Sequence, residues 1–140
     1  MGIVVAVIAA IQFVPVDTGN PGVVPSHSIY EVEPVPMEVA TTLESSCSNC
    51  HSFHTVWPWY SRIAPASWLI AHDVHEGRAH LNFSEWVAYA ENKREQKLEE
   101  ICEQIVNGDM PDGKYLLVHH GARLSQEQKD AVCSWTESLR

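Results

Sequence analysis

Two cysteines and two histidines lie within eight residues of this 140-residue chain, in the segment CSNCHSFH that runs from Cys47 to His54. Thiols and imidazoles at this density suit three kinds of site: structural zinc, a redox dithiol, or covalently attached haem. The four side chains are spaced i, i+3, i+4 and i+7, so on a helix they share one face and cannot surround a zinc ion tetrahedrally. A redox dithiol is expected after a strand, and no strand pattern precedes this segment.

Haem attachment is the chemistry that this spacing favours. C-x-x-C-H is the signature of c-type haem, in which Cys47 and Cys50 each bind one vinyl group and His51 is the proximal iron ligand. The motif occurs once, so we expect one haem c, held through two thioethers. The other ring N–H of His51 needs an acceptor, for which the carbonyls of Pro58 and Pro65 are equal candidates.

The second axial ligand of a c-type iron is usually Met or His. Met110 lies in the segment NGDMP, where glycine and proline keep the chain out of a helix and can present the thioether to the open haem face. Met110 is therefore the predicted distal ligand. The histidine alternatives, of which His80 ranks first, are His72, His75, His80, His119 and His120.

Four further residues are predicted to contact the cofactor. Trp57, Trp59 and Tyr60 closely follow the motif and are expected to surround the porphyrin, with an indole N–H or a phenol O–H available to a propionate. Arg78 is expected to pair with a propionate, because arginine suits carboxylate recognition. Arg62 is an alternative for that pairing.

Hydrophobic periodicity and capping signals predict an all-α domain. Gly77 is expected to end the second helix, and Ser125 with Gln128 forms a capping box for the last one. No stretch alternates as a strand does. The expected helices cover residues 37–49, 65–77, 83–106 and 126–139.

Two further cysteines, Cys102 and Cys133, lie beside apolar residues of the third and fourth expected helices. If these helices pack together, the two thiols can form a disulfide, which would contribute about 3 kcal/mol. A pair of buried free thiols is an equal alternative.

The first 16 residues are apolar apart from Gln12, which predicts a membrane anchor or a signal helix, and we favour an uncleaved anchor. As a helix they would span roughly 24 Å, short of the ~30 Å hydrocarbon core. Residues 17–36 are rich in proline and glycine and are expected to be an extended tether before the folded domain of residues 37–140. Either role implies export, so we expect the protein in the periplasm or on the extracytoplasmic face of the cytoplasmic membrane.

Acidic residues outnumber basic ones by 18 to 9, which gives a formal net charge of −9. Such a charge argues against nucleic-acid binding, which calls for a basic face. It suits attraction to a basic protein partner.

Besides the cysteine motif, the chain contains several longer motifs: WPWYS (57–61), APASW (64–68), EGRAHLNFSEW (76–86), GDMP (108–111) and HGARLS (120–125). With these, residues 37–140 resemble the single-haem, cytochrome c-like haem-binding domain (Haem_bd) family. The resemblance implies a small cytochrome c fold and covalent haem c, with Cys47, Cys50 and His51 at the attachment site and Met110 as distal ligand. The missing basic leader and the pair of additional cysteines depart from the family pattern.

These features together predict a membrane-tethered monohaem cytochrome c that carries electrons, rather than an enzyme that binds a small-molecule substrate. Its expected partners are redox proteins, such as a respiratory or photosynthetic membrane complex. Two alternatives stay open: a haem peroxidase or gas sensor with a labile sixth ligand, and a structural cytochrome subunit of a larger electron-transport complex.

Overall fold

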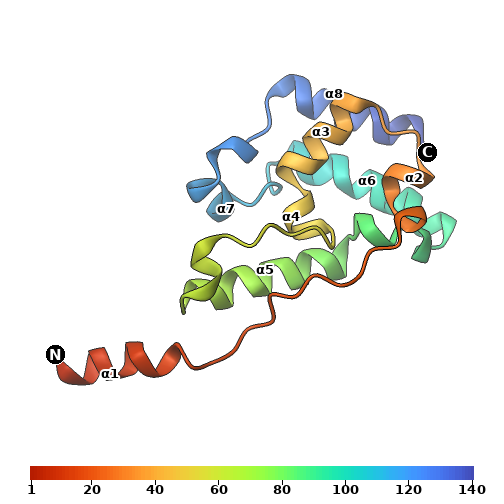
Figure 1. The fold of residues 1–140 in the computed structure, drawn as a ribbon. Coiled ribbons are helices and arrows are strands. Elements are labelled where there is room, and N and C mark those ends of the chain that lie inside the picture. Colours follow the sequence, from red (N-terminus) through yellow and green to blue (C-terminus); the bar gives the residue numbers. More distant parts are fainter.

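The computed structural model describes all 140 residues, and its regular elements are all helical, which confirms the predicted all-α class (Figure 1). Four short 3-10 helices are η1 (Pro25–His27), η2 (Trp59–Arg62), η3 (Phe83–Ala88) and η4 (His120–Ala122). The α-helices are α1 (Gly2–Ile11), α2 (Ile29–Val32), α3 (Met37–Ser46), α4 (Ser48–His51), α5 (Ala66–His80), α6 (Glu91–Asn107), α7 (Gly113–Val118) and α8 (Gln126–Ser138).

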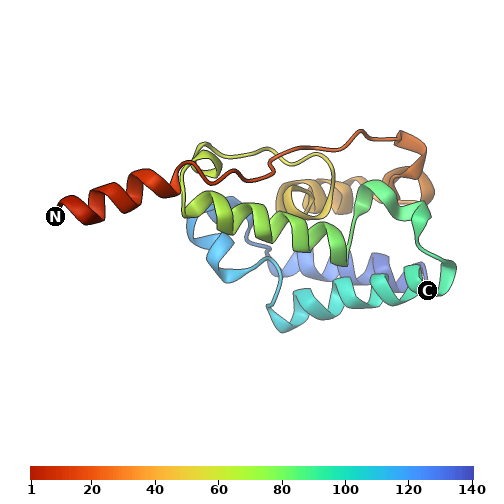
Figure 2. The same ribbon diagram turned by 90° about the horizontal axis from the view of Figure 1, so that it is seen from below.

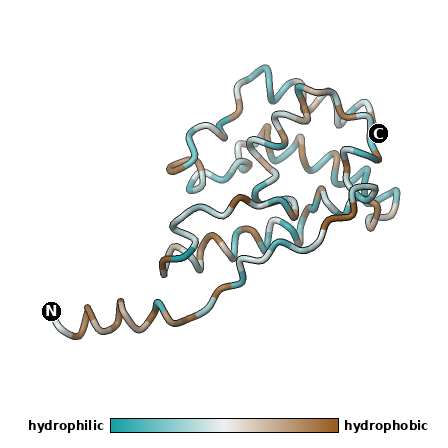
Figure 3. Tube along the Cα trace, viewed as in Figure 1, coloured by the Kyte–Doolittle hydropathy of each residue, from teal (hydrophilic) through white to brown (hydrophobic).

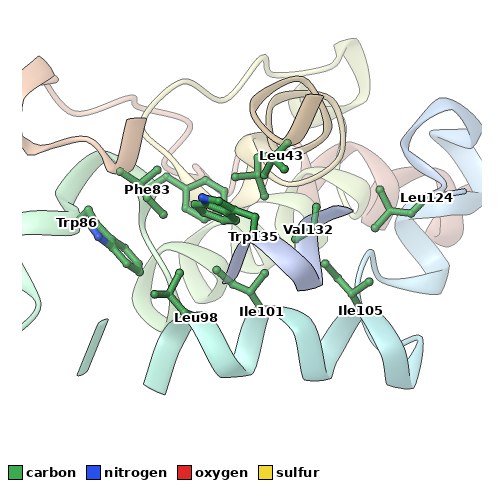
Figure 4. Packing of buried hydrophobic residues seen from close by; sticks show 11 residues of the cluster. Leu43, Phe83, Trp86, Leu98, Ile101, Ile105, Leu124, Val132 and Trp135 are labelled. Carbon is green, nitrogen blue, oxygen red and sulfur yellow. The ribbon is translucent and has the colours of Figure 1, made fainter. Parts of the chain in front are cut away.

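The hydrophobic core lies where α6, α8 and α3 meet. Leu98, Ile101 and Ile105 recur at helical spacing on α6, so they form one apolar stripe. This stripe faces Val132 and Trp135 of α8 (Figure 4). A disulfide between Cys102 of α6 and Cys133 of α8 links the same two helices.

Two of the expected helices are interrupted, whereas the last one forms with the predicted capping box of Ser125 and Gln128. The first expected helix breaks at Cys47, whose φ of −124° separates α3 from α4. The third divides into η3 and α6 because Tyr89 adopts an extended conformation. The Tyr89 hydroxyl accepts a bond from the Asn82 backbone N–H at 2.9 Å, which holds the chain in this turn.

The second half of the expected tether belongs to the folded core, so that boundary prediction is wrong. Ile29 of α2 is fully buried in the core cluster. The indole of Trp86 donates a hydrogen bond to Glu33 at 2.8 Å, and the indole of Trp135 donates one to the carbonyl of Pro34 at 3.2 Å. Buried tryptophan N–H groups need acceptors, and this segment supplies two of them.

Helix α1 runs away from the rest of the molecule in both ribbon views (Figures 1 and 2). Its ten residues, GIVVAVIAAI, are all apolar, and none of them is buried. No helix of the structure combines the length and the apolar character needed to cross a membrane. At 1.5 Å per residue, α1 is roughly 15 Å long, about half of a ~30 Å hydrocarbon core.

Candidate functional site

A cavity of about 700 Å³ opens between α3, α4, α5 and α6, within the usual range for a cofactor pocket of ~300–1,000 Å³. Its lining includes Cys47, Cys50 and His51 from the motif, and also Met110, which follows α6. The structure therefore brings together both halves of the ligand set predicted from the sequence.

The orientation of His51 is set by two backbone carbonyls. Its Nδ1 lies 3.0 Å from the oxygen of Gly77 and 3.0 Å from the oxygen of Leu81, so Nδ1 carries the proton and donates it to both. These acceptors replace the Pro58 and Pro65 carbonyls suggested by the sequence, and that prediction is wrong. Nε2 has no protein partner and is left with a free lone pair. Burial lowers the pKa of the imidazole, which favours the neutral form that binds iron.

Gly77 lies inside α5 and does not end it, contrary to the sequence prediction, since the helix continues to His80. A Cβ built at Gly77 would lie 2.6 Å from the carbonyl oxygen of Cys50. Only a residue without a side chain lets α5 approach the motif helix α4 this closely. The close approach also brings the Gly77 carbonyl within reach of His51.

Both motif cysteines are free thiols beside the cavity. Burial, with a smaller contribution from Cys50, raises the pKa of Cys47 to about 12. Burial and then Asp73 raise the pKa of Cys50 to about 11, against the opposing charge of Arg78. Both groups therefore stay protonated at neutral pH.

The loop that carries Met110 folds back onto the end of α6. Gly108 has a φ of 79°, the left-handed conformation that ends a helix and that glycine adopts without strain. The backbone N–H groups of Asp109 and Met110 then donate to the carbonyl of Gln104 at 3.0 and 3.1 Å. The Met110 side chain lines the cavity and is 41 % exposed, so it lies at the cavity edge.

The remaining lining is apolar in the interior and acidic at the rim. Lys97 of α6 is the one lysine or arginine among the lining residues, and its ammonium lies 3.4 Å from the carboxylate of Glu100. Acidic lining residues are Asp73, Glu76, Glu100, Glu103 and Asp112. Apolar lining residues include Leu43, Ile70, Phe83, Ile101, Ile105 and Leu124.

A family model described as the haem-binding domain matches residues 6–138. The chain belongs to the haem-binding domain family. No curated protein and no solved structure gives a significant match. Membership supports haem binding, and the site fits that cofactor: it combines two thiols, a neutral imidazole with a free Nε2 and a thioether around one largely apolar cavity.

The cavity lining does not include Trp57, Trp59, Tyr60 or Arg78, the four other residues predicted to contact the cofactor. Trp59 is 77 % exposed on η2, and the Tyr60 hydroxyl lies 3.2 Å from Nε2 of His119. Trp57 has a buried indole N–H without a protein partner. The structure therefore removes these aromatic side chains from the expected porphyrin environment.

Arg78 forms hydrogen bonds with protein groups outside the cavity. Its guanidinium donates to the carbonyls of Ser52 and Gly19 at 2.9 and 3.1 Å, and to the side chains of Asn20 and Thr55 at 2.7 and 2.9 Å. These bonds fix the loop after the CSNCH motif to the segment that follows α1. Arg62 also lies outside the cavity.

Among the histidine alternatives, His72 and His80 line the cavity, and His75, His119 and His120 do not. The His80 side chain is 81 % exposed and lies 3.8 Å from the carboxylate of Glu76 on the preceding turn. Neither histidine is held by a loop as Met110 is.

Several lining residues were not predicted from the sequence, among them Lys97, Phe83 and Tyr115. A signal for Lys97 was present, because it precedes Ile101 by four residues and so shares the apolar face of the long helix. Phe83 and Tyr115 had no comparable signal, since each lies in a short helix set by tertiary contacts. The Tyr115 hydroxyl accepts a bond from Asn49 of the motif at 3.2 Å, which joins α7 to α4.

Proposed function

We propose that this protein is a monohaem c-type cytochrome that transfers single electrons, with His51 as proximal and Met110 as distal iron ligand. The observation that carries the proposal is that Cys47, Cys50, His51 and Met110 line one cavity although Met110 lies far along the chain from the motif. When bound, haem would supply a one-electron Fe(II)/Fe(III) couple. The protein holds the ligands and limits the access of water.

Each group of the site has a defined task in this proposal. Cys47 and Cys50 would hold the two vinyl groups as thioethers, each formed by net addition of one S–H across one vinyl double bond. The carbonyls of Gly77 and Leu81 hold the proximal imidazole in one tautomer. The apolar lining keeps the surroundings of the iron at low polarity.

Lys97 takes the role that the sequence suggested for Arg78. It is the one permanent cation of the cavity lining, and a propionate carboxylate is the part of the cofactor that a cation can pair with. Its side chain is 19 % exposed, so its charge is only partly screened by water.

We place the protein outside the cytoplasm and attached to a membrane. The disulfide Cys102–Cys133 suits an oxidising compartment, because such bonds seldom persist in the cytosol. The exposed apolar surface of α1 suits contact with lipid. Redox proteins remain the proposed partners.

A visible spectrum with a redox titration tests the proposal. The expected result is one haem c, a low-spin ferric state with a thioether–iron charge-transfer band, and reversible one-electron titration. Mass spectrometry should show haem bound covalently to the peptide that contains Cys47 and Cys50. High-spin resting iron, or haem that is removed by acid and solvent, would contradict it.

A peroxidase or gas-sensing activity is the second candidate, and one observation favours it. Met110 is 41 % exposed on a loop, so it can leave the iron more readily than a buried ligand, and His72 and His80 line the same cavity as proton donors or acceptors. Rapid peroxide turnover by the resting protein, or binding of carbon monoxide to the reduced form without denaturant, would support this function over simple electron transfer.

A further inference from the structure

Exposed apolar side chains gather at the end of the molecule from which α1 projects. We call this surface the apolar end: helix α1 together with Trp59, Ile63, Leu69, Leu117 and Val118. The last five are between 46 % and 77 % exposed, and every residue of α1 is at least partly exposed. Figure 3 shows hydrophobic colour along α1 and on the nearby edge of the domain.

Printed contacts join the parts of the apolar end. The side chain of Gln12 at the end of α1 both donates to the carbonyl of Ala64, at 3.1 Å, and accepts from its N–H, at 3.0 Å. Ala64 adjoins Ile63 and lies just after η2. The contact between Tyr60 of η2 and His119 then brings the end of α7, with its exposed residues, to the same side.

The segment after α1 is held against the domain rather than free. Besides the paired bonds at Gln12, the side chain of Asn20 donates to the carbonyl of Thr55 at 2.9 Å, and Arg78 donates to the carbonyl of Gly19 at 3.1 Å. Because these bonds fix the segment after α1 to the domain, the position of α1 in a membrane would determine the orientation of the domain.

The segments that form the apolar end also differ from the rest of the chain in their charge. None of the 18 acidic residues lies in residues 1–16, 45–72 or 113–126, the segments that supply the apolar end. Arg62 adds an exposed positive charge to η2. The acidic residues of the cavity rim lie outside these segments, although Asp73 of α5 and Asp112 at the start of α7 adjoin them. An anionic surface would therefore meet less acidic charge at the apolar end than at the cavity rim.

We propose that the apolar end is the face on which the folded domain rests on an anionic lipid bilayer, with α1 in the acyl region and Trp59 and Leu117 at the headgroup level. A tryptophan and aliphatic side chains beside a basic residue are the composition of a membrane interface. This inference rests on the proposed membrane attachment and adds an orientation to it: the acidic rim of the cavity is turned toward solvent and a basic partner.

Fluorescent labels test the orientation in the full-length holoprotein. An environment-sensitive nitrobenzoxadiazole label is placed at Trp59→Cys, Leu117→Cys or Val87→Cys, the last on η3 at the opposite end of the domain (Figure 1). With vesicles of phosphatidylcholine and phosphatidylglycerol, the emission maximum should shift to the blue at positions 59 and 117 and stay unchanged at 87. Flotation without a shift at positions 59 and 117 would mean that α1 alone holds the protein, and would overturn the proposal.

Vesicle flotation tests how much the exposed side chains of the apolar end contribute to membrane affinity. The double variant Trp59→Ser/Leu117→Ser should bind about tenfold more weakly, because burial of two large side chains is lost, while Val87→Ser should bind normally. Arg62→Gln should bind about fivefold more weakly to anionic vesicles and unchanged to phosphatidylcholine alone, with Lys93→Gln as the matched control.

Two outcomes show whether the orientation alone is wrong or whether the proposed membrane attachment is wrong as well. If the protein fails to float at all, both the membrane attachment and the orientation are wrong, while the haem spectrum and titration still decide electron transfer independently. If sedimentation without lipid shows a dimer that Trp59→Ser converts to a monomer, the apolar end is a protein interface and the lipid proposal is overturned.

Discussion

The carbonyl oxygen of Gly77 lies 3.0 Å from Nδ1 of His51, and the missing side chain of the same glycine leaves room for the carbonyl of Cys50. One residue on α5 thus fixes both the distance between two helices and the tautomer of the proposed iron ligand. The second carbonyl, from Leu81, comes just after the end of the same helix. The proximal side of the site therefore depends on α5 as much as on the motif itself.

Replacing Gly77 by alanine should damage the site without touching any ligand. The new Cβ would lie 2.6 Å from the Cys50 oxygen, so α4 and α5 must separate, at a cost of about 1–3 kcal/mol in the free energy of unfolding. The free energy of unfolding measured with urea and the yield of covalently bound haem should both fall. Gly121→Ala is the control, because nothing lies within 4 Å of its added carbon. Equal stability of the two variants would contradict the packing argument.

Replacing Met110 by alanine should remove the proposed sixth ligand. We expect loss of the thioether–iron charge-transfer band and a fall in midpoint potential on the order of 0.1 V, part of the ~0.8 V range that axial ligands span. Met37→Ala is the control, since Met37 is 85 % exposed and lies outside the cavity. A low-spin spectrum that keeps the band in the Met110 variant would show that another residue binds the iron.

The Lys97→Gln variant should have a lower midpoint potential, because a nearby positive charge favours the reduced iron. Two unit charges ~10 Å apart at an effective dielectric constant of ~20 interact by roughly 1.7 kcal/mol, so loss of one partly buried charge of the cavity lining should shift the potential by tens of millivolts. Lys93→Gln makes the same charge change one turn earlier, outside the cavity lining. Equal potentials in the two variants would exclude Lys97 from the role that we assign to it.

The Arg78→Gln variant should lower the stability of the protein without changing the haem spectrum, whereas Lys97→Gln should change the midpoint potential. It loses charge-assisted bonds to Ser52, Gly19, Asn20 and Thr55, so the free energy of unfolding should fall by about 2 kcal/mol. The haem spectrum should stay that of the wild type, because the guanidinium does not line the cavity. A changed axial-ligand band would return Arg78 to the cofactor site.

Removing the disulfide with Cys102→Ser/Cys133→Ser should lower the free energy of unfolding by about 3.5 kcal/mol, as expected for a closed loop of 31 residues. Urea unfolding at fixed haem content measures the change. The wild-type protein, unfolded without reductant, should offer neither of these thiols to an alkylating reagent. Their alkylation would show that the bond does not form.

The sequence by itself determined the all-α class, the CSNCH motif and the loop that carries Met110, because these depend on local spacing and on glycine and proline conformations. The capping box of Ser125 and Gln128 formed as predicted for the same reason. Family membership likewise followed from motifs that can be read along the chain.

Only the tertiary structure decided the surroundings of the motif. Nearness along the chain suggested Trp57, Trp59, Tyr60 and Arg78 as cofactor contacts, but the chain turns away after α4, and the cavity is completed by α6 and α7. The acceptors for His51 come from α5 because Gly77 permits a close helix contact, which no local pattern specifies. Side chains far apart in sequence meet where helices bury their apolar faces, and that choice of partners belongs to the whole fold.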